Sequence, residues 1–418
     1  MASLRITIAL ASSYFVFAIM LNSVGTVILQ AINSLDVSKT DASILEGFKD
    51  LSIAIMSFLV ASFIPRIGYK IAMLCALLLV SALCLLVPSI AEFWVLKALF
   101  AAIGCSFAVV KISVYSIIGQ LSDNANKHSS LLNTIEGVFM LGVLSGYWIF
   151  ALFIDANNPQ SNEWLNVYYM LAAIVLVTTF TVLTAPIKSP ELHNQKQSQV
   201  DAFLDMLKLT YQPLVLIFVV SAFLYVLIEQ GVGTWLPTFN NQVLKLPVDV
   251  SIQLASLFAA ALALGRLVAG QVLRFISWFK MLLTCLITMG LLILLVLPLT
   301  HDVDGSQVKN IFDVPFAAYM LPLVGFFMAP IYPLLNSVML SSLEKHKHAA
   351  MTGLIVVFSA LGGTTGSIIT GFVFDKFSGQ HAFYLTLLPI VLLLVSVSAF
   401  KKATLVLENG LTRQAIKE

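Results

Sequence analysis

The amino-acid sequence predicts an all-α membrane protein with about twelve transmembrane helices. Of its 418 residues, 59% are hydrophobic and only 11% are charged, and the mean hydropathy is +0.96. A water-soluble domain of this size needs far more charge to cover its surface. The segments 71–87 and 282–297 are apolar on every face, whereas a transmembrane β-barrel shows short segments of alternating polarity. Helices are therefore the predicted spans.

The apolar segments can be placed one by one, because a membrane-spanning helix needs roughly 20 mostly apolar residues. The spans are expected at 6–30, 42–64, 70–88, 93–118, 130–154, 164–185, 212–238, 250–274, 278–299, 313–340, 349–374 and 380–401.

The longest polar break, 187–211, divides the spans six and six. Its second part places Val200, Phe203, Leu204 and Leu207 on one helical face, which is typical of a short amphipathic helix on a membrane surface. We therefore expect an N-terminal six-helix bundle (1–186), a linker (187–211), a C-terminal six-helix bundle (212–402) and a tail (403–418). Two six-helix halves around a midplane site are a common transporter plan.

The basic residues predict the orientation of the chain. With a cytoplasmic N-terminus, fifteen Lys and Arg lie in cytoplasmic segments and five in external ones. The cytoplasmic set is Arg5, Arg66, Lys70, Lys127, Lys188, Lys196, Lys208, Arg274, Lys280, Lys345, Lys347, Lys401, Lys402, Arg413 and Lys417, and the external set is Lys39, Lys97, Lys245, Lys309 and Lys376. This ratio fits the positive-inside rule. We expect a monomeric, multi-pass protein of a cell membrane, such as a bacterial inner membrane, with both termini in the cytoplasm.

Charged residues inside the predicted spans are candidates for function. A charge at the bilayer centre costs roughly 2.5 to 3.5 kcal/mol and usually faces a partner or a water-filled cavity. The chain has seven, and they are Glu46, Lys49, Asp50, Lys111, Glu136, Glu229 and Arg266.

Lys111 and Glu136 are expected at a similar depth, about 10 Å from the cytoplasmic edge at 1.5 Å per residue. They can therefore pair. The pair is either a static salt bridge that fixes two helices, or one that opens when Lys111 meets an anionic substrate group or Glu136 takes a proton.

Glu46 and Asp50 are four residues apart and share one face of the second span, where Lys49 can partly neutralise them. Two acids on one face disfavour double ionisation, which suits a proton site. Alternatively, Glu46 simply lies near the external water. Glu229, beside Gln230 and a pair of glycines, is the leading candidate in the second half, either as a substrate or proton residue or as a structural residue at a helix break.

Short motifs resemble the major facilitator superfamily. The segment 61–70, Ala-Ser-Phe-Ile-Pro-Arg-Ile-Gly-Tyr-Lys, resembles a degraded form of its loop signature, with Ala61 and Pro65 in place of the signature's Gly and Asp. Within the superfamily, the chain looks most like the fucose permease group. The matching stretches are Phe223 to Trp235, Gly265 to Gly270, Phe327 to Pro333 and Gly371 to Asp375.

The chain also departs from that group. Fucose permeases carry a membrane-embedded Asp in span one and a Glu in span four, whereas Asn22 and Phe107 stand at the comparable places here. Sugar specificity is therefore not implied.

The resemblance implies a cavity lined by spans one, four, seven and ten, with spans three, six, nine and twelve, which contain none of the seven charged residues, facing lipid. Aromatic residues of the cavity spans can stack on a solute, and nearby amides can bond to it. The candidate substrate-binding residues are Asn22, Gln30, Lys111, Tyr115, Glu229, Gln230, Trp235, Tyr332 and Asn336. The candidate proton-coupling or gating residues are Glu46, Asp50, Glu136, Glu229 and Arg266, although Arg266 follows the subgroup motif and is more often structural.

The expected function is secondary active transport. The chain has no Walker A loop, no HExxH and no Gly-x-Ser-x-Gly, so we expect no enzyme, no cofactor, no metal and no nucleic-acid partner. The sequence favours a proton-coupled symporter that imports a small polar solute, which is sugar-like, an amino acid or an organic acid. The alternative is an exporter of a larger amphipathic compound of drug or siderophore type, and a more remote one is a membrane receptor or intramembrane enzyme.

Overall fold

The computed structural model describes residues 2–122, 125–155, 158–187, 206–301, 303–344 and 347–415. Every regular element in these ranges is helical. The predicted amphipathic residues Val200, Phe203 and Leu204 lie outside the described residues, while Leu207 lies in a helical turn and is 39% exposed.

The first half of the chain forms one bundle. Its elements are α1 (Ala2–Asn22), α2 (Val24–Ser34), α3 (Lys39–Ala42), α4 (Ile44–Ile67), α5 (Tyr69–Ile90), α6 (Phe93–Leu121), α7 (Ala125–Ala151), η1 (Asn162–Asn166) and α8 (Val167–Thr184). Within it, α1 packs on α7, and α6 packs on α4 and α5.

The second half forms the other bundle. Its elements are η2 (Leu209–Tyr211), α10 (Pro213–Gly233), α11 (Leu236–Gln242), α12 (Val248–Val272), α13 (Trp278–Leu299), η3 (Ile311–Asp313), α14 (Phe316–Met320), α15 (Leu323–Met328), α16 (Ile331–Ser341), α17 (His348–Lys376), α18 (Gly379–Leu385) and α19 (Leu387–Ala415). Here α10 packs on α17 and α19, and α12 packs on α15.

Eleven helical segments in the described residues are long and apolar enough to cross a membrane. They correspond to all the predicted spans except 42–64. That span is α4, which has 24 residues but carries Glu46, Lys49 and Asp50 near its start. Outward faces of α5 and α13 remain apolar and exposed, for example Leu79 (49%) and Leu295 (66%), as expected of helices that contact lipid.

Proline and glycine explain where several helices end. Span 313–340 is divided into α14, α15 and α16, and a proline stands directly before each of the three. Proline has no N–H to donate and is well tolerated in the first turn of a helix. Between α4 and α5 the chain turns at Gly68, whose φ of 92° favours glycine.

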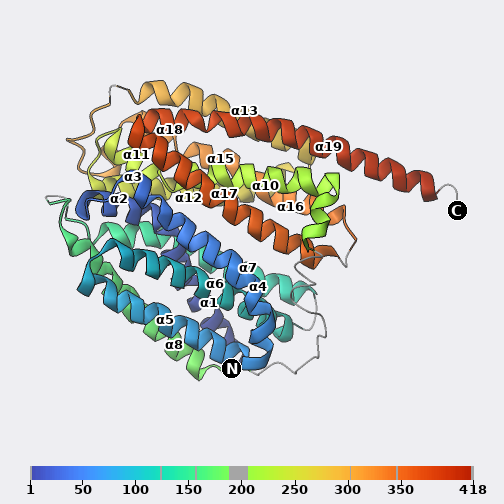
Figure 1. The fold of residues 1–418 in the computed structure, drawn as a ribbon, viewed down its shortest axis with the longest axis horizontal. Helices are drawn as coiled ribbons and strands as arrows, with labels where there is room; N and C mark the ends of the chain where they lie inside the picture. Colours follow the sequence, from blue (N-terminus) through green and yellow to red (C-terminus); the bar gives the residue numbers. More distant parts are fainter. Residues whose placement is uncertain are drawn as a thin grey trace.

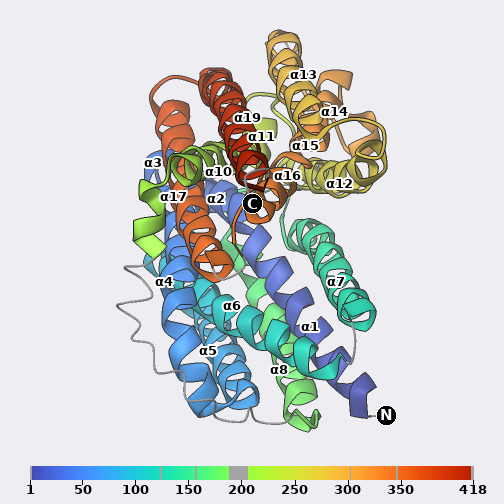
Figure 2. The same cartoon turned by 90° about the vertical axis from the view of Figure 1, so that its right-hand side faces the viewer.

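The two bundles meet along two pairs of helices (Figures 1 and 2): α4 lies against α17, and α7 lies against α12. At one end of the molecule, α2 and α3 of the first bundle also contact α11 and α17 of the second. We call this the sealed end, and it is the left-hand end in Figure 1. The opposite end, where α6, α12 and α16 finish, is called the open end.

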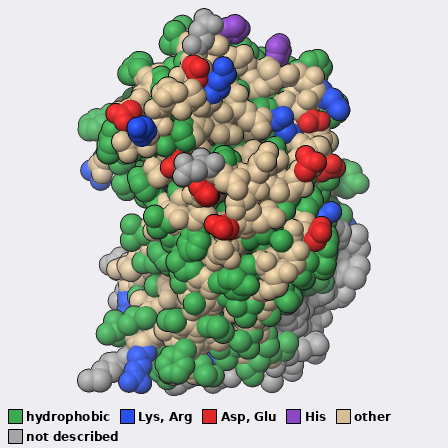
Figure 3. All heavy atoms as spheres, turned by 90° about the vertical axis from the view of Figure 1, so that its left-hand side faces the viewer, with side chains coloured by type: hydrophobic (Ala, Val, Ile, Leu, Met, Phe, Trp, Pro, Cys, Tyr) green, Lys and Arg blue, Asp and Glu red, His purple; other side chains and the backbone are tan. Residues whose placement is uncertain are grey.

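Polar and apolar contacts close the sealed end. Thr40 donates a hydrogen bond to Asp375 (Oγ1 to Oδ2, 3.2 Å), and the Lys39 ammonium lies 5.7 Å from the centre of the Phe374 ring. Leu29 of α2 forms an apolar cluster with Ile252 of α12. Acidic and basic side chains gather on the upper part of this face in Figure 3, with histidines at its upper edge, as expected for a surface in water.

Candidate functional site

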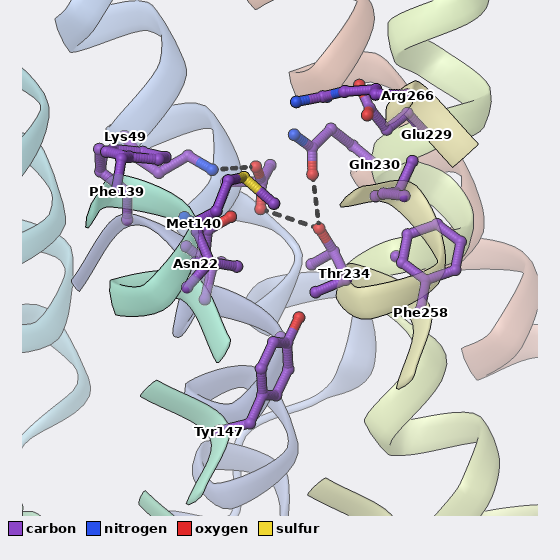
Figure 4. A pocket seen from close by; sticks show the side chains of 18 residues that line it. Asn22, Lys49, Phe139, Met140, Tyr147, Glu229, Gln230, Thr234, Phe258 and Arg266 are labelled. Carbon is purple, nitrogen blue, oxygen red and sulfur yellow. Dashed lines mark hydrogen bonds and ion pairs between the residues drawn. The ribbon is translucent and has the colours of Figure 1, made fainter. Parts of the chain in front are cut away.

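A cavity of about 160 Å³ lies between the two bundles. It is lined by α1, α2, α4 and α7 of the first bundle and by α10, α12 and Thr234, which follows α10, of the second. The predicted site residues that line it are Asn22, Glu46, Glu229, Gln230 and Arg266, joined by Lys49. Charged groups from both bundles therefore face one cavity (Figure 4).

Lys49 connects the two acids of α4. Its ammonium forms an ion pair with Glu46, and its Nζ lies 3.4 Å from Asp50 Oδ1. Glu46 is fully buried, and Lys49 is only 6% exposed. The spacing of these residues on one helical face predicted this proximity, and the structure places the group at the bundle interface rather than in external water.

The α4 charges also touch the second bundle. Thr234, at the break between α10 and α11, lies 3.2 Å from Glu46 Oε2 and 3.0 Å from Gln230 Oε1, so its hydroxyl can donate to either oxygen. Asp50 Oδ2 packs so closely on Gly363 of α17 that a side chain at this glycine would collide with it. Both acids of α4 therefore contact the second bundle directly.

In the second bundle, Glu229 is held by a tyrosine. Tyr225 donates a hydrogen bond to Glu229 Oε1 (3.1 Å) and stacks on Tyr332 with ring centroids 5.4 Å apart. Tyr332 in turn lies 2.8 Å from the hydroxyl of Ser359. Arg266 lies beside Glu229 (Figure 4) and is exposed. One turn beyond Tyr332, the buried Oδ1 of Asn336 has no hydrogen-bond partner among the described residues.

The predicted ion pair between Lys111 and Glu136 is not present in this structure. Glu136 instead accepts a hydrogen bond from Tyr115 (2.9 Å), and the Lys111 ammonium lies 5.8 Å from the centre of the Phe107 ring. The two residues do lie at similar depth, because Tyr115, one turn from Lys111, reaches Glu136. Depth alone does not predict that a tyrosine one turn from Lys111 takes the carboxylate.

Besides Lys111 and Glu136, six other predicted residues do not line the cavity, and they are Asp50, Tyr115, Tyr332, Asn336, Trp235 and Gln30. Trp235 is fully buried, and its Nε1 donates to the backbone and hydroxyl oxygens of Ser367 (3.1 and 3.2 Å). Gln30 is 1% exposed within α2 at the sealed end. Asn22 does line the cavity, but its side-chain amide donates to the Ala18 carbonyl of its own helix.

Sequence reasoning missed Thr234 and Tyr147, which both line the cavity. Thr234 follows the Gly231 and Gly233 pair, and that helix-break signal could have identified it. Tyr147 directly follows Gly146 of a Gly-x-x-x-Gly motif, and such a motif by itself indicates only close helix packing. Among the described residues, no group of three or more His, Cys, Asp or Glu could hold a metal ion.

Comparison with known proteins identifies relatives of the chain. The family model of the Major Facilitator Superfamily matches residues 10–364. The multidrug efflux pump Tap of Mycolicibacterium fortuitum is 24% identical over 287 residues, which are 68% of this chain and 64% of Tap. A TsgA homolog of Buchnera aphidicola subsp. Baizongia pistaciae is 24% identical over 62% of this chain and 60% of its own length. The matches thus span less than two thirds of these relatives.

Solved structures share the fold. The nucleoside transporter NupG superposes with a TM-score of 0.73 at 15% identity, covering 95% of this chain and 99% of NupG. A bacterial homolog of the lysosomal transporter Spinster gives 0.72 at 13% identity, covering 96% of each chain. FucP in the outward conformation gives 0.60 at 15% identity, covering 96% of this chain and 99% of FucP. At such identities the likeness concerns the fold alone.

Proposed function

The chain belongs to the major facilitator superfamily, and from this we propose that it is a proton-coupled symporter that imports a small polar solute by alternating access. The observation that carries the proposal is that charged groups of both bundles face one cavity, sealed from one end of the molecule. A solute held between two bundles is exposed to one side or the other as the bundles rock.

The α4 charges are the proposed proton site. Lys49 carries one positive charge and contacts two carboxylates, so one negative charge remains when both are ionised. An uncompensated charge at membrane depth is costly, and binding one proton removes it. Because Glu46 contacts Thr234 and Asp50 contacts Gly363, that proton changes groups on which the second bundle rests.

The solute site is proposed between the bundles on the open side of this proton site. Arg266, Glu229 and Gln230 would contact the solute from the second bundle, and Asn22, Lys111 and Tyr115 from the first. Tyr332 and Asn336 would extend the site toward the open end, and Glu136 would set the charge near Lys111. Gln30 and Trp235, both buried at the sealed end, would contact the solute only when that end opens.

We propose that the open end faces the cytoplasm. Both termini and most loop lysines and arginines would lie on that side, in keeping with the positive-inside rule. The chain would then function as a monomer in a bacterial inner membrane, with 1–186 and 212–402 as its bundles, 187–211 as a cytoplasmic linker and 403–418 as a cytoplasmic tail.

A second candidate is export of an amphipathic compound. The relative Tap is named a multidrug efflux pump. An aromatic cluster on the first bundle favours this reading: the ring of Phe107 lies 6.0 Å from those of both Tyr14 and Phe139. The cavity argues for a smaller solute, because about 160 Å³ is below the roughly 300–1,000 Å³ of sites for drug-sized ligands.

Uptake by proteoliposomes tests the proposal. Purified protein is reconstituted and offered labelled sugars, amino acids, nucleosides and organic acids, with and without an acidic exterior. A symporter accumulates one class when the exterior is acidic, and a protonophore abolishes the accumulation. Uptake at the same rate with and without the proton gradient would contradict proton coupling. Extrusion of ethidium, a planar cation, driven by the gradient would favour the exporter.

A further inference from the structure

The two bundles present the same combination of groups toward the solute site. In each, a tyrosine hydroxyl donates a hydrogen bond to a glutamate: Tyr115 to Glu136 over 2.9 Å in the first, and Tyr225 to Glu229 over 3.1 Å in the second. In each, a cation lies near that glutamate. Arg266 lines the cavity beside Glu229, and Lys111 lies one turn of α6 from Tyr115, which bonds to Glu136.

Neither cation is neutralised by a direct contact. Within the described part of the chain, no carboxylate oxygen lies within 4.0 Å of Lys111 or Arg266. Both side chains are exposed, and Gly137, beside Glu136, has open space where a side chain would stand. In each bundle the tyrosine hydroxyl bonds to one carboxylate oxygen of the glutamate. The second carboxylate oxygen and the N–H donors of the cation therefore remain available for a ligand.

These groups are matched to a ligand that carries both charges. A purely anionic solute would satisfy the cations but place its charge near Glu136 and Glu229, and a purely cationic solute would do the reverse. A charge left without a partner in a partly dehydrated site is penalised strongly. A solute with one carboxylate and one ammonium leaves neither kind of group without a partner.

Aromatic rings flank both charged groups. Phe107, under Lys111, lies 6.0 Å from Phe139, which lines the cavity, and the stacked Tyr225 and Tyr332 lie beside Glu229. Such surfaces accommodate an apolar side chain and also attract an ammonium group.

We infer that the solute is a small zwitterion of the amino-acid class, with its carboxylate bound by the cation of one bundle and its ammonium by the glutamate of the other. This inference rests on the proposed transport function and specifies its substrate. Since the ligand bridges the bundles, its binding draws them together across the site, as rocking around a fixed solute requires.

Thermal unfolding of the purified full-length protein tests the inference with charge-matched probes. The twenty amino acids are screened singly, together with sugars, nucleosides and organic acids. A ligand that binds the folded state raises the unfolding temperature by mass action. For each amino acid that does so, the analogue without the amino group and the analogue without the carboxylate are measured, as with leucine, 4-methylpentanoate and isoamylamine. We expect the zwitterion to bind at least ten-fold more tightly than either analogue.

Variants of the two cations test which of them binds the carboxylate of the amino acid. Of Lys111→Gln and Arg266→Gln, the change that removes the cation bound to the carboxylate should weaken amino-acid binding at least ten-fold, and the other change should weaken it less. The substitution that retains the charge at that position, Lys111→Arg or Arg266→Lys, should preserve most of the binding. The matched control is Lys97→Gln, because Lys97 lies on the same helix α6 with its ammonium 5.2 Å from the Phe93 ring. It should bind like the wild type.

The outcomes separate the inference from the function on which it rests. Binding and uptake of a sugar, a nucleoside or a singly charged solute, with none for any amino acid, would overturn the inference and leave transport standing. Equal binding of an amino acid and its two analogues would also overturn it. Absence of uptake for every class in proteoliposomes would overturn the proposed function itself.

Discussion

A single ammonium group contacts two carboxylates at the interface between the bundles. Lys49 contacts Glu46 and Asp50 on the same helix, and all three residues lie where α4 meets the second bundle. In such a group the cost of removing the cation exceeds the cost of removing the whole set, because two buried acids are left without compensation.

Replacing Lys49 should therefore destabilise the folded protein. We expect Lys49→Met to lower the free energy of unfolding by about 3–5 kcal/mol, measured as a reduced thermal unfolding temperature. Adding Glu46→Gln and Asp50→Asn to the same chain should recover most of the loss. Lys97→Met is the control, and a Lys49→Met protein as stable as this control would show that the α4 charges do not depend on each other.

The proton role of α4 is tested at Asp50. In the wild type, uptake should depend on pH because one of the two acids exchanges a proton during the cycle. Asp50→Asn removes the excess negative charge, so its uptake should be slower and should vary much less with pH. Glu92→Gln, at the exposed start of α6, should keep the pH profile of the wild type. An unchanged profile in Asp50→Asn would exclude this residue as the coupling site.

The charges on α4 could be predicted from the sequence, but their partners could not. Glu46, Lys49 and Asp50 are neighbours on one helical face, so local periodicity is sufficient to place them together. The contact of Glu46 with Thr234 joins residues 188 positions apart on different bundles. Likewise, the intervention of Tyr115 between Lys111 and Glu136 depends on the rotation of α6 and α7, which spacing along one helix does not fix.

At the scale of helices, two interrupted spans face each other at the sealed end. Span 6–30 is broken at Ser23 into α1 and α2, and span 212–238 is broken at Thr234 and Trp235 into α10 and α11. At this crossing Gly25 packs against the backbone carbonyl of Thr234, too closely for any side chain. The absence of a side chain at Gly25 thus permits the bundles to close.

Gly25→Ala should favour separation of the bundles at the sealed end. A methyl group there would collide with backbone, which cannot move aside as a flexible side chain can. The readout is labelling by a hydrophilic maleimide of a cysteine at position 238, since Thr238 is fully buried on α11. Labelling should be several-fold faster with Gly25→Ala. Gly119→Ala, which would have open space around it, should change nothing, and equal labelling in both variants would contradict the close packing inferred for Gly25.

Hydrophobic length predicted the spans well, with several boundaries within a few residues. The predicted span 278–299 coincides with α13, and 349–374 lies within α17. The break at Ser23 was not predicted, because no proline marks it and the surrounding residues remain apolar. The break at Thr234 was not predicted either, although Pro237 in the first turn of α11 could have indicated it. Span 313–340 contains Pro322 and Pro330, so its division into short helices was accessible from the sequence.

At the scale of the whole molecule, the polar break at 187–211 and the resemblance to the superfamily predict two bundles, whereas the contacts between the bundles are known only from the structure. The closing contacts, such as Thr40 with Asp375, connect residues 335 positions apart. No periodicity encodes which end of the molecule is sealed. The position of the cavity, with its charges from both bundles, follows from that closure.

The central claim is that solute crosses by opening of the sealed end, and a reversible cross-link tests it most directly. Thr40→Cys and Asp375→Cys are introduced into a protein whose Cys75, Cys84, Cys105 and Cys285 are serines, and a short, cleavable thiol-specific cross-linker joins the bundles across the 3.2 Å contact. The control pair is Ser89→Cys with Tyr169→Cys, whose side chains touch within the first bundle (3.3 Å).

The measurement is proteoliposome uptake of the labelled solute that the wild type accumulates, before cross-linking, after it and after cleavage of the linker. We predict that the cross-link between the cysteines introduced at positions 40 and 375, once formed, stops uptake, that cleavage restores it, and that the control pair transports throughout. Undiminished uptake with the bundles covalently joined at the sealed end would contradict the account.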